Sequence, residues 1–276
     1  MTSAGLMDPL STFRERFGAP RALIGMLHVG ALPGTPAARH SIDRLIEHTV
    51  AEARIYRDAG FTAAALENMN DRPYLKGGVG PEVTAAMTAL AREVKRETGL
   101  VLGVQVLAAA NREALAVALA SGADFVRVEG FVFAHVADEG VIESCAGELL
   151  RYRRTIGADR VLVFADIKKK HSAHAITGDV SLAATARAAE LFLADGVIVT
   201  GAASGEAASP DEVSDAARAV RLPVLVGSGT SLQNLARFGD AHGFLVGSSL
   251  KQGGVWSNPL DRRAVESMAQ AFAKLT

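Results

Sequence analysis

Cysteine is nearly absent from this sequence: Cys145 is the single one in 276 residues. One cysteine excludes an internal disulfide framework and is compatible with a reducing compartment. The N-terminal residues also lack the basic segment and apolar core of a secretory signal. We therefore expect a cytoplasmic protein.

Long apolar runs and an excess of one sign of charge are missing as well. The longest apolar stretch, residues 100–110, contains Gln105 and is too short to cross a bilayer. The 29 basic and 30 acidic residues give a net charge of −1. The sequence therefore lacks the excess of positive charge that is typical of nucleic-acid-binding proteins. We expect no integral membrane segment and no nucleic-acid partner.

Aromatic residues are scarce too, at 5% against 49% hydrophobic residues in all. An aliphatic core of this kind suits a parallel sheet that is buried on both faces. The length suits one (β/α)₈ barrel of roughly 250 residues better than two separate domains. We therefore predict one domain over residues 1–276.

Eight apolar runs, many of them β-branched, alternate with amphipathic helical patterns along the chain. The runs cover residues 22–29, 63–68, 101–107, 125–130, 161–167, 196–201, 224–228 and 243–248. Strands that alternate with helices imply an α/β fold with a parallel sheet, and eight of them suggest a closed TIM barrel. Leu10, Phe13 and Phe17 share one helical face, so a short N-terminal helix within residues 1–20 should cover the barrel floor.

Two glycine-serine turns near the C-terminus follow the last two of these runs. They are Gly227-Ser228-Gly229 and Gly247-Ser248-Ser249, and a helix-compatible segment follows each. Glycine lets backbone N–H groups approach an anion closely, and a helix N-terminus favours negative charge. Two such turns match the phosphate site after strands 7 and 8 of a (β/α)₈ barrel. The alternative is that the glycines serve only tight turns.

Polar residues interrupt the apolar runs near their C-terminal ends, where TIM barrels carry their chemistry. These residues are His28, Glu67, Asn68, Gln105, Arg127, Glu129, Asp166, Lys168 and Thr200. Because residues i and i+2 of a strand share a face, Arg127 should project with Glu129, and Asp166 with Lys168. Each pair could be a catalytic element with shifted pKa values or a salt bridge that fills a barrel layer.

Metal binding is the weaker interpretation of these residues. Glu67, Glu129 and Asp166 could collect Mg²⁺ together with a phosphate ligand. His171 and His174 lie three residues apart where no helix is predicted, which is poor evidence for a site. We assign no metal ligands and no certain cofactor.

Several segments together resemble one known family. They are residues 24–34 (IGMLHVGALPG), 67–68 (EN), 80–82 (GPE), 122–128 (GADFVRV), 138–140 (DEG), 148–153 (ELLRYR), 170–171 (KH), 226–229 (VGSG) and 246–251 (VGSSLK). From about residue 10 onward the sequence is similar to the BtpA/SgcQ family, named for a role in photosystem I accumulation. The resemblance implies a TIM barrel of the ribulose-phosphate-binding type. Gln105, Glu129 and Lys168 depart from the family pattern, which implies altered specificity.

Our leading interpretation is an enzyme that acts on a small phosphorylated metabolite, such as a sugar phosphate, as a lyase, aldolase or isomerase. Asp166 and Lys168 would act on the reacting carbon, with Glu67, Arg127, Glu129 and His28 as the other catalytic residues. A Schiff base on Lys168 is conceivable. Substrate or phosphate would contact Asn68, Gln105, His171, Thr200, Gly201, Gly227, Ser228, Gly229, Gly247, Ser248 and Ser249.

Two other functions remain open at this stage. One is a non-catalytic assembly or regulatory protein that has kept a metabolite-binding barrel. The other is a nucleoside or nucleotide-sugar hydrolase, against which the lack of an aromatic-rich segment near the strand ends counts mildly. Fold alone does not decide among them. A homo-oligomer is expected only from the general frequency of oligomers.

Overall fold

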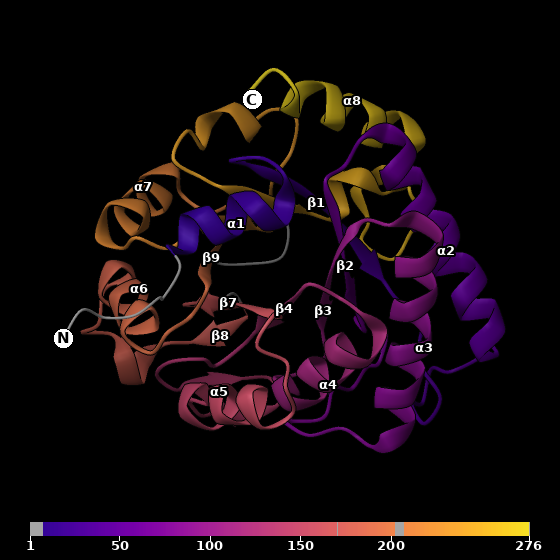
Figure 1. Ribbon diagram of the computed structural model, residues 1–276, viewed down its shortest axis with the longest axis horizontal. Coiled ribbons are helices and arrows are strands. Elements are labelled where there is room, and N and C mark those ends of the chain that lie inside the picture. The colour runs from indigo at the N-terminus through magenta and orange to yellow at the C-terminus, as the bar shows by residue number, and fades with distance from the viewer. Residues whose placement is uncertain (1–7, 170, 202–206, 276) are drawn as a thin grey trace.

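Eight parallel strands close into a barrel in the computed structural model, which describes residues 8–169, 171–201 and 207–275 (Figure 1). The strands are β1 (Ala22–His28), β2 (Ala63–Glu67), β3 (Val101–Gln105), β4 (Phe125–Val128), β7 (Leu162–Ile167), β9 (Gly196–Thr200), β10 (Val224–Gly227) and β11 (Gly243–Val246). Neighbouring strands pair in this order, and β11 closes on β1. The predicted TIM-barrel fold is confirmed.

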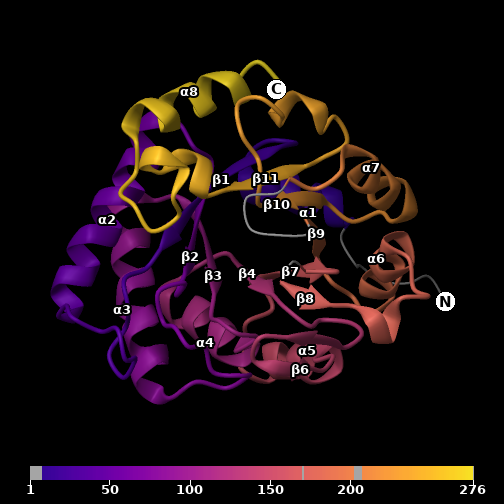
Figure 2. The ribbon, with the colours of Figure 1, turned by 180° about the vertical axis from the view of Figure 1, so that it is seen from behind.

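Helices surround the barrel as an outer ring (Figure 1). They are α2 (Ile42–Ala59), α3 (Pro81–Thr98), α4 (Asn111–Ser121), α5 (Ala146–Thr155), α6 (Leu182–Leu191), α7 (Pro210–Ala219) and α8 (Arg262–Phe272). Local sequence sets several of their ends: Ser41 accepts a hydrogen bond from Arg44 N at the start of α2, and Gly60 ends that helix at φ 90°. Figure 2 shows α8 beside α2, so the last helix of the chain completes the ring.

The floor of the barrel is closed by the short helix α1 (Pro9–Phe17). Phe17 packs 5.8 Å from Phe125 between ring centroids, and Phe13 packs 6.2 Å from Phe164. These rings fill the barrel interior at the N-terminal ends of the strands, which leaves the C-terminal ends as the open face.

A small antiparallel sheet adds to the open end, and the sequence patterns did not predict it. It consists of β5 (His135–Ala137), β6 (Gly140–Ile142) and β8 (Ser172–Ala173). Two of its strands come from the loop after β4 and the third from the loop after β7, so it ties these two loops together. A short 3₁₀ turn, η1 (Ala175–Thr177), follows β8.

The segments after the two glycine-serine turns differ from expectation. The first helical segments after β10 and β11 are 3₁₀ turns, namely η2 (Leu235–Arg237), η3 (Ser248–Leu250) and η4 (Gln252–Gly254), and α8 begins only at Arg262. A single 3₁₀ turn aligns few peptide dipoles, so the helix-dipole part of the predicted phosphate site is wrong.

Over the described ranges, no helix combines the length and apolarity that crossing a membrane requires.

Candidate active site at the open end of the barrel

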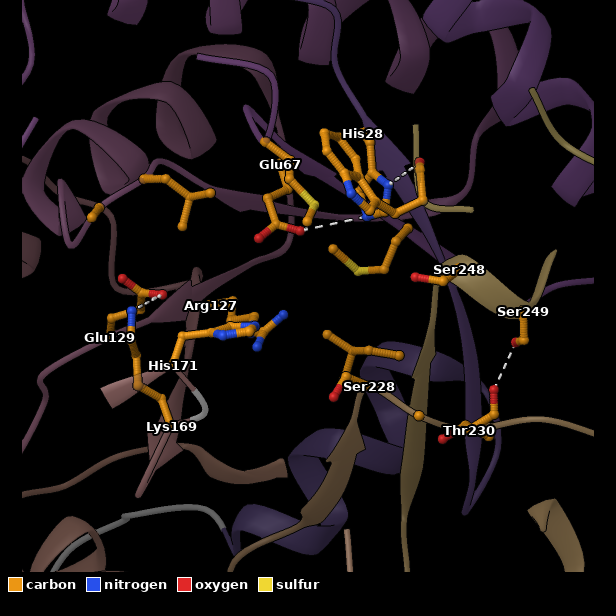
Figure 3. A pocket seen from close by; sticks show the side chains of 18 of the residues that line it. His28, Glu67, Arg127, Glu129, Lys169, His171, Ser228, Thr230, Ser248 and Ser249 are labelled. Carbon is orange, nitrogen blue, oxygen red and sulfur yellow. Dashed lines mark hydrogen bonds and ion pairs between the residues drawn. The ribbon is translucent and has the colours of Figure 1, made fainter. Parts of the chain in front are cut away.

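A cavity of about 720 Å³ lies at the C-terminal ends of the strands (Figure 3). Ten of the residues expected at a site line it: His28, Glu67, Arg127, Glu129, His171, Ser228, Gly229, Gly247, Ser248 and Ser249. Seven others do not: Asn68, Gln105, Asp166, Lys168, Thr200, Gly201 and Gly227. The glycine-serine turns, Glu67 with His28, and Glu129 form separate parts of its wall in Figure 3.

The turns after β10 and β11 form one wall, and hydrogen bonds hold them together. Ser249 Oγ donates to the backbone oxygen of Thr230 at 2.7 Å, which joins the two turns. Asn234 closes the first turn by donating to Gly229 O and accepting from Ser231 N, both at 2.8 Å. The result is a fixed polar wall.

Two hydroxyl groups in this wall are buried and have no hydrogen-bond partner among the described residues. They are Ser228 Oγ and Thr230 Oγ1. Within the described residues, the backbone N–H groups of Gly229, Thr230, Ser248 and Ser249 also have no hydrogen-bond acceptor. Buried polar groups are normally paired, so the two unpaired hydroxyls indicate that a polar ligand completes this wall, and the four N–H groups offer it further donors.

Two of the glycines have packing roles. A Cβ on Gly227 would lie 2.5 Å from Ile198 Cγ2, which only glycine avoids. A Cβ on Gly247 would lie 3.3 Å from His28 Cε1, so glycine lets this turn approach the histidine closely. Gly227 therefore supports the wall from behind, although it was expected to contact the ligand.

The side chain of Arg127, on β4, reaches Asp166 on the neighbouring strand β7 and forms two hydrogen bonds with it. Its Nε and Nη2 donate to the two carboxylate oxygens at 2.9 and 3.1 Å. Burial opposes the charge, but the neighbouring carboxylates, Asp166 first among them, raise the pKa of Arg127 above its ordinary value. Asp166 was expected over the reacting carbon. That geometry is wrong, because both of its oxygens face Arg127 and its side chain is only 1% exposed.

The lysine that enters the cavity is Lys169 rather than Lys168. Lys168 follows the last residue of β7 and has a φ of 48°, and its Nζ donates to Thr177 O at 2.9 Å. The alternation of side chains along the strand therefore stops at Ile167, and Lys169 lines the cavity in place of Lys168. Asp166 and Lys168 share a second, smaller cavity, but neither lines the large one.

Lys169 pairs with Glu129 at 3.0 Å between Nζ and Oε1. Burial raises the pKa of Glu129, and Lys169 acts in the opposite direction. Gln105 does not reach the cavity, and its Nε2 donates to Glu129 Oε1 at 3.4 Å. Glu129 Oε2 is buried without a partner. Arg127 and Glu129 both line the cavity, as their shared strand face predicted, but each forms its ion pair with another residue.

His28 is held in one tautomer by a backbone carbonyl. Its Nδ1 lies 3.1 Å from Trp256 O, which can only accept, so Nδ1 carries the proton. Burial lowers the pKa of His28, and the carboxylate of Glu67 opposes that shift. The neutral ring then presents the lone pair of Nε2, which lies 3.7 Å from Glu67 Oε2. This arrangement suits a group that accepts a proton.

Asn68, Thr200 and Gly201, expected to contact ligand, lie elsewhere. Asn68 accepts from Leu107 N at 2.7 Å and donates to Asp71 at 2.9 Å, so it anchors the loop after β3. Thr200 and Gly201 are buried at the end of β9, and the following residues 202–206 lie outside the described part of the chain.

The geometry of Glu67, Glu129 and Asp166 does not favour metal binding. Asp166 faces Arg127 and Glu129 faces Lys169, so two of the three are already paired with cations. Among residues 8–169, 171–201 and 207–275, no three His, Cys, Asp or Glu side chains group as a metal site would require.

Several lining residues, among them Lys169 and Arg72, were not singled out as site residues from the sequence. Lys169 stands in a run of lysines, and no pattern shows which of them turns inward. Arg72 lies over the ring of Trp256, with 5.0 Å from its Cζ to the ring centroid. Both depend on loop conformations that strand periodicity does not describe.

Residues 19–274 match the model of the BtpA family. The chain belongs to this family. A mitochondrial protein of Caenorhabditis elegans, named only as uncharacterized, is 47% identical over 87% of this chain and 88% of its own length. The photosystem I biogenesis protein BtpA of Synechocystis is 32% identical over 97% of this chain and 92% of its own length. The resemblance inferred from the motifs is confirmed.

Solved structures support the fold of this BtpA-family chain. An N-(5′-phosphoribosyl)anthranilate isomerase from Pyrococcus furiosus aligns with a TM-score of 0.54 and 14% identity, covering 92% of this chain and 99% of its own. An orotidine 5′-phosphate decarboxylase from Pyrococcus horikoshii aligns with a TM-score of 0.56 and 14% identity, covering 91% and 99%. At this identity the similarity shows the barrel alone.

Proposed function

We propose that this protein is an enzyme acting on a small phosphorylated metabolite of the sugar-phosphate kind. The observation that carries the proposal is the wall with unpartnered Ser228 and Thr230 hydroxyls and unpaired N–H groups. A phosphate group offers several strong acceptor oxygens to such donors at once. Its position after the last two barrel strands is where phosphate sites of TIM barrels lie.

The rest of the cavity suits proton transfer next to a polarised carbonyl or hydroxyl group. Neutral His28 and Glu67 can accept a proton, whereas Arg127 can stabilise negative charge that develops on an oxygen. A Cβ at Gly227 would lie 3.7 Å from Arg127 Nη2, so this guanidinium lies close to the phosphate wall. These groups support a lyase, aldolase or isomerase reaction, with Asp166 holding Arg127 in place.

Thermal unfolding with matched ligands tests this proposal. Ribose 5-phosphate, ribitol 5-phosphate and inorganic phosphate are compared with ribose and ribitol. A phosphate compound at about 100 times its Kd should raise the Tm by roughly 5 °C, corresponding to about 2.7 kcal/mol. Ribose and ribitol should give no shift. If no phosphate compound raises the Tm, the phosphate site is disproved.

A non-catalytic role in assembly is the second candidate. The observation in its favour is that the Synechocystis relative is named as a photosystem I biogenesis protein. This candidate predicts no turnover of any compound that binds, and biological function that survives substitutions in the cavity. An assay for turnover of the compounds that raise the Tm separates the two candidates, because an assembly protein that has kept a metabolite-binding barrel can bind a phosphate compound without converting it.

A further inference from the structure

The ion pair of Lys169 and Glu129 lies in the wall of the cavity, apart from the phosphate wall (Figure 3). The side chains are only 12% and 7% exposed, and the lysine Nζ lies 3.0 Å from Glu129 Oε1. Removing two charges from water costs free energy that a single pairing only partly returns, so such a pair is weak evidence for stability. A chemical role explains its position better.

Among the described residues, the other nearby lysines lack this combination of burial, a carboxylate partner and access to the cavity. Lys168 Nζ is bound to Thr177 O, outside the cavity. Lys251 is buried as well, but it binds both oxygens of Glu52 on α2, behind the barrel wall. Within the described ranges, Lys169 alone among the lysines lines this cavity.

We propose that Lys169 is a catalytic residue that forms an imine with the carbonyl carbon of an open-chain phosphorylated aldose or ketose. The inference rests on the proposed function, because the phosphate wall would hold the other end of this substrate. It narrows the substrate class to sugar phosphates with an aldehyde or ketone group. A closed sugar ring or a polyol phosphate offers no carbon that an amine can attack in this way.

The proton needed for this step has a local acceptor. A lysine attacks only as the neutral amine, and Glu129 Oε1 lies within hydrogen-bond distance of its Nζ. Burial raises the pKa of Glu129, which makes its carboxylate a better proton acceptor than an exposed one, and its Oε1 is placed next to the ammonium group. The two charges then disappear together, and the neutral pair is better suited to a dry site.

The step balances in atoms and charge. The Nζ lone pair adds to the carbonyl carbon, and one of the two Nζ protons moves to the oxygen of that carbonyl to give a neutral carbinolamine. Glu129 returns its proton to this oxygen, the carbon–oxygen bond breaks and water leaves. The product is a positively charged imine on Lys169 next to a carboxylate again. The positively charged imine then pairs with the carboxylate of Glu129, as the ammonium group did before.

Borohydride trapping tests the proposal. The protein is incubated with ribose 5-phosphate or ribulose 5-phosphate and sodium borohydride, digested, and analysed by peptide mass spectrometry. Hydride reduces an imine to a stable secondary amine, so the sugar phosphate should remain on Lys169. Lys169→Arg should lose this adduct, whereas Lys168→Arg is the matched control and should keep it. Ribitol 5-phosphate, which lacks a carbonyl, should leave no adduct.

Binding and trapping are measured on the same samples, so that two failures can be told apart. If ribitol 5-phosphate raises the Tm but neither carbonyl sugar phosphate leaves an adduct on Lys169, the imine is disproved and the phosphate site stands. Adducts of equal yield with ribose, or on Lys168, would also overturn it. If no phosphate compound raises the Tm of any variant, both proposals fail. A preserved ribitol 5-phosphate shift in Lys169→Arg shows that this variant is folded.

Discussion

At the residue scale, the cavity combines groups that are satisfied within the protein with groups that are not. Arg127 and Asp166 satisfy one another through two hydrogen bonds, and Lys169 pairs with Glu129. The Thr230 hydroxyl, in contrast, is buried and unpaired. A buried hydroxyl without a partner costs free energy, which a bound acceptor would restore. Unpaired groups therefore indicate where a ligand binds more directly than charged ones do.

Thr230→Val tests this argument at one atom, because valine keeps the shape and removes the hydroxyl. We expect the Kd for ribitol 5-phosphate to rise about tenfold, the equivalent of about 1.4 kcal/mol for one lost hydrogen bond. The Tm of the unliganded variant should stay equal or rise, since no internal hydrogen bond is lost. Titration calorimetry and thermal unfolding measure the two quantities.

A matched control for this substitution is Thr49→Val, which removes a hydroxyl that donates to Leu45 O at 2.8 Å within α2. Its loss should lower the Tm and leave the Kd for ribitol 5-phosphate as in the wild type. The opposite pattern, with Thr230→Val binding as tightly as the wild type, would show that its hydroxyl does not face the phosphate.

Sequence reasoning identified residues that line the cavity but not the partners that they contact there. Polar residues at strand ends identified His28, Glu67, Arg127 and Glu129, because strand periodicity fixes which face a side chain takes. It could not distinguish Lys168 from Lys169, since a single residue with φ 48° at the end of β7 exchanges their directions. The partners also come from neighbouring strands, and the sequence of one strand does not specify its register with the next.

At the element scale, the eight barrel strands were predictable because each is a short apolar run between helix signals. Their starts agree with the structure within one residue, and several end one or two residues early. The sheet of β5, β6 and β8 was not predictable, because its strands are two or three residues long. Its pairing joins loops far apart in the sequence, such as Val136 with Ala173.

The helix α1 is attached to the barrel through one carboxylate. Asp124 accepts from Arg16 at 2.9 Å, from Lys95 at 2.6 Å and from Leu102 N at 2.8 Å. Asp124→Ala would leave these three donors without the acceptor. We expect a loss of about 3 kcal/mol in the free energy of unfolding, measured by urea denaturation.

Asp159→Ala is the matched control for the substitution of Asp124. It removes the carboxylate of an ion pair with Arg154 whose side chains are 52% and 81% exposed. Its cost should stay below about 1 kcal/mol, since exposed pairs contribute little. Equal losses in the two variants would mean that Asp124 does not anchor the N-terminal helix.

At the scale of the whole molecule, the aromatic packing and the polar cavity occupy opposite ends of the barrel. The floor is sealed by the rings of Phe13 and Phe17, whereas charged and unpaired polar groups gather at the open end. Buried titratable groups at the open end make global stability depend on pH. The sign of this pH dependence follows from the difference between each group's pKa in the folded and in the unfolded protein.

His135 on β5 illustrates this dependence. Burial lowers its pKa to about 4, and Lys169 and His174 act in the same direction. The unfolded chain titrates near 6.5, so between about pH 6.5 and 4 it binds a proton that the folded protein does not. Stability should fall on acidification by about 1.4 kcal/mol per pH unit from this residue, and remain constant above pH 6.5.

Comparison of the wild type with His135→Gln isolates this contribution. His28 adds to the loss at low pH and Glu129 opposes it, because their pKa values are lowered and raised by burial, but both effects are common to the two proteins. Urea denaturation at pH 7.5 and 5.5 should show a wild type that loses about 1.4 kcal/mol more than the variant. The exposed His48→Gln is the control and should follow the wild type. Parallel curves for the wild type and His135→Gln would mean that His135 also gains its proton in the folded protein, and that the small sheet opens to water.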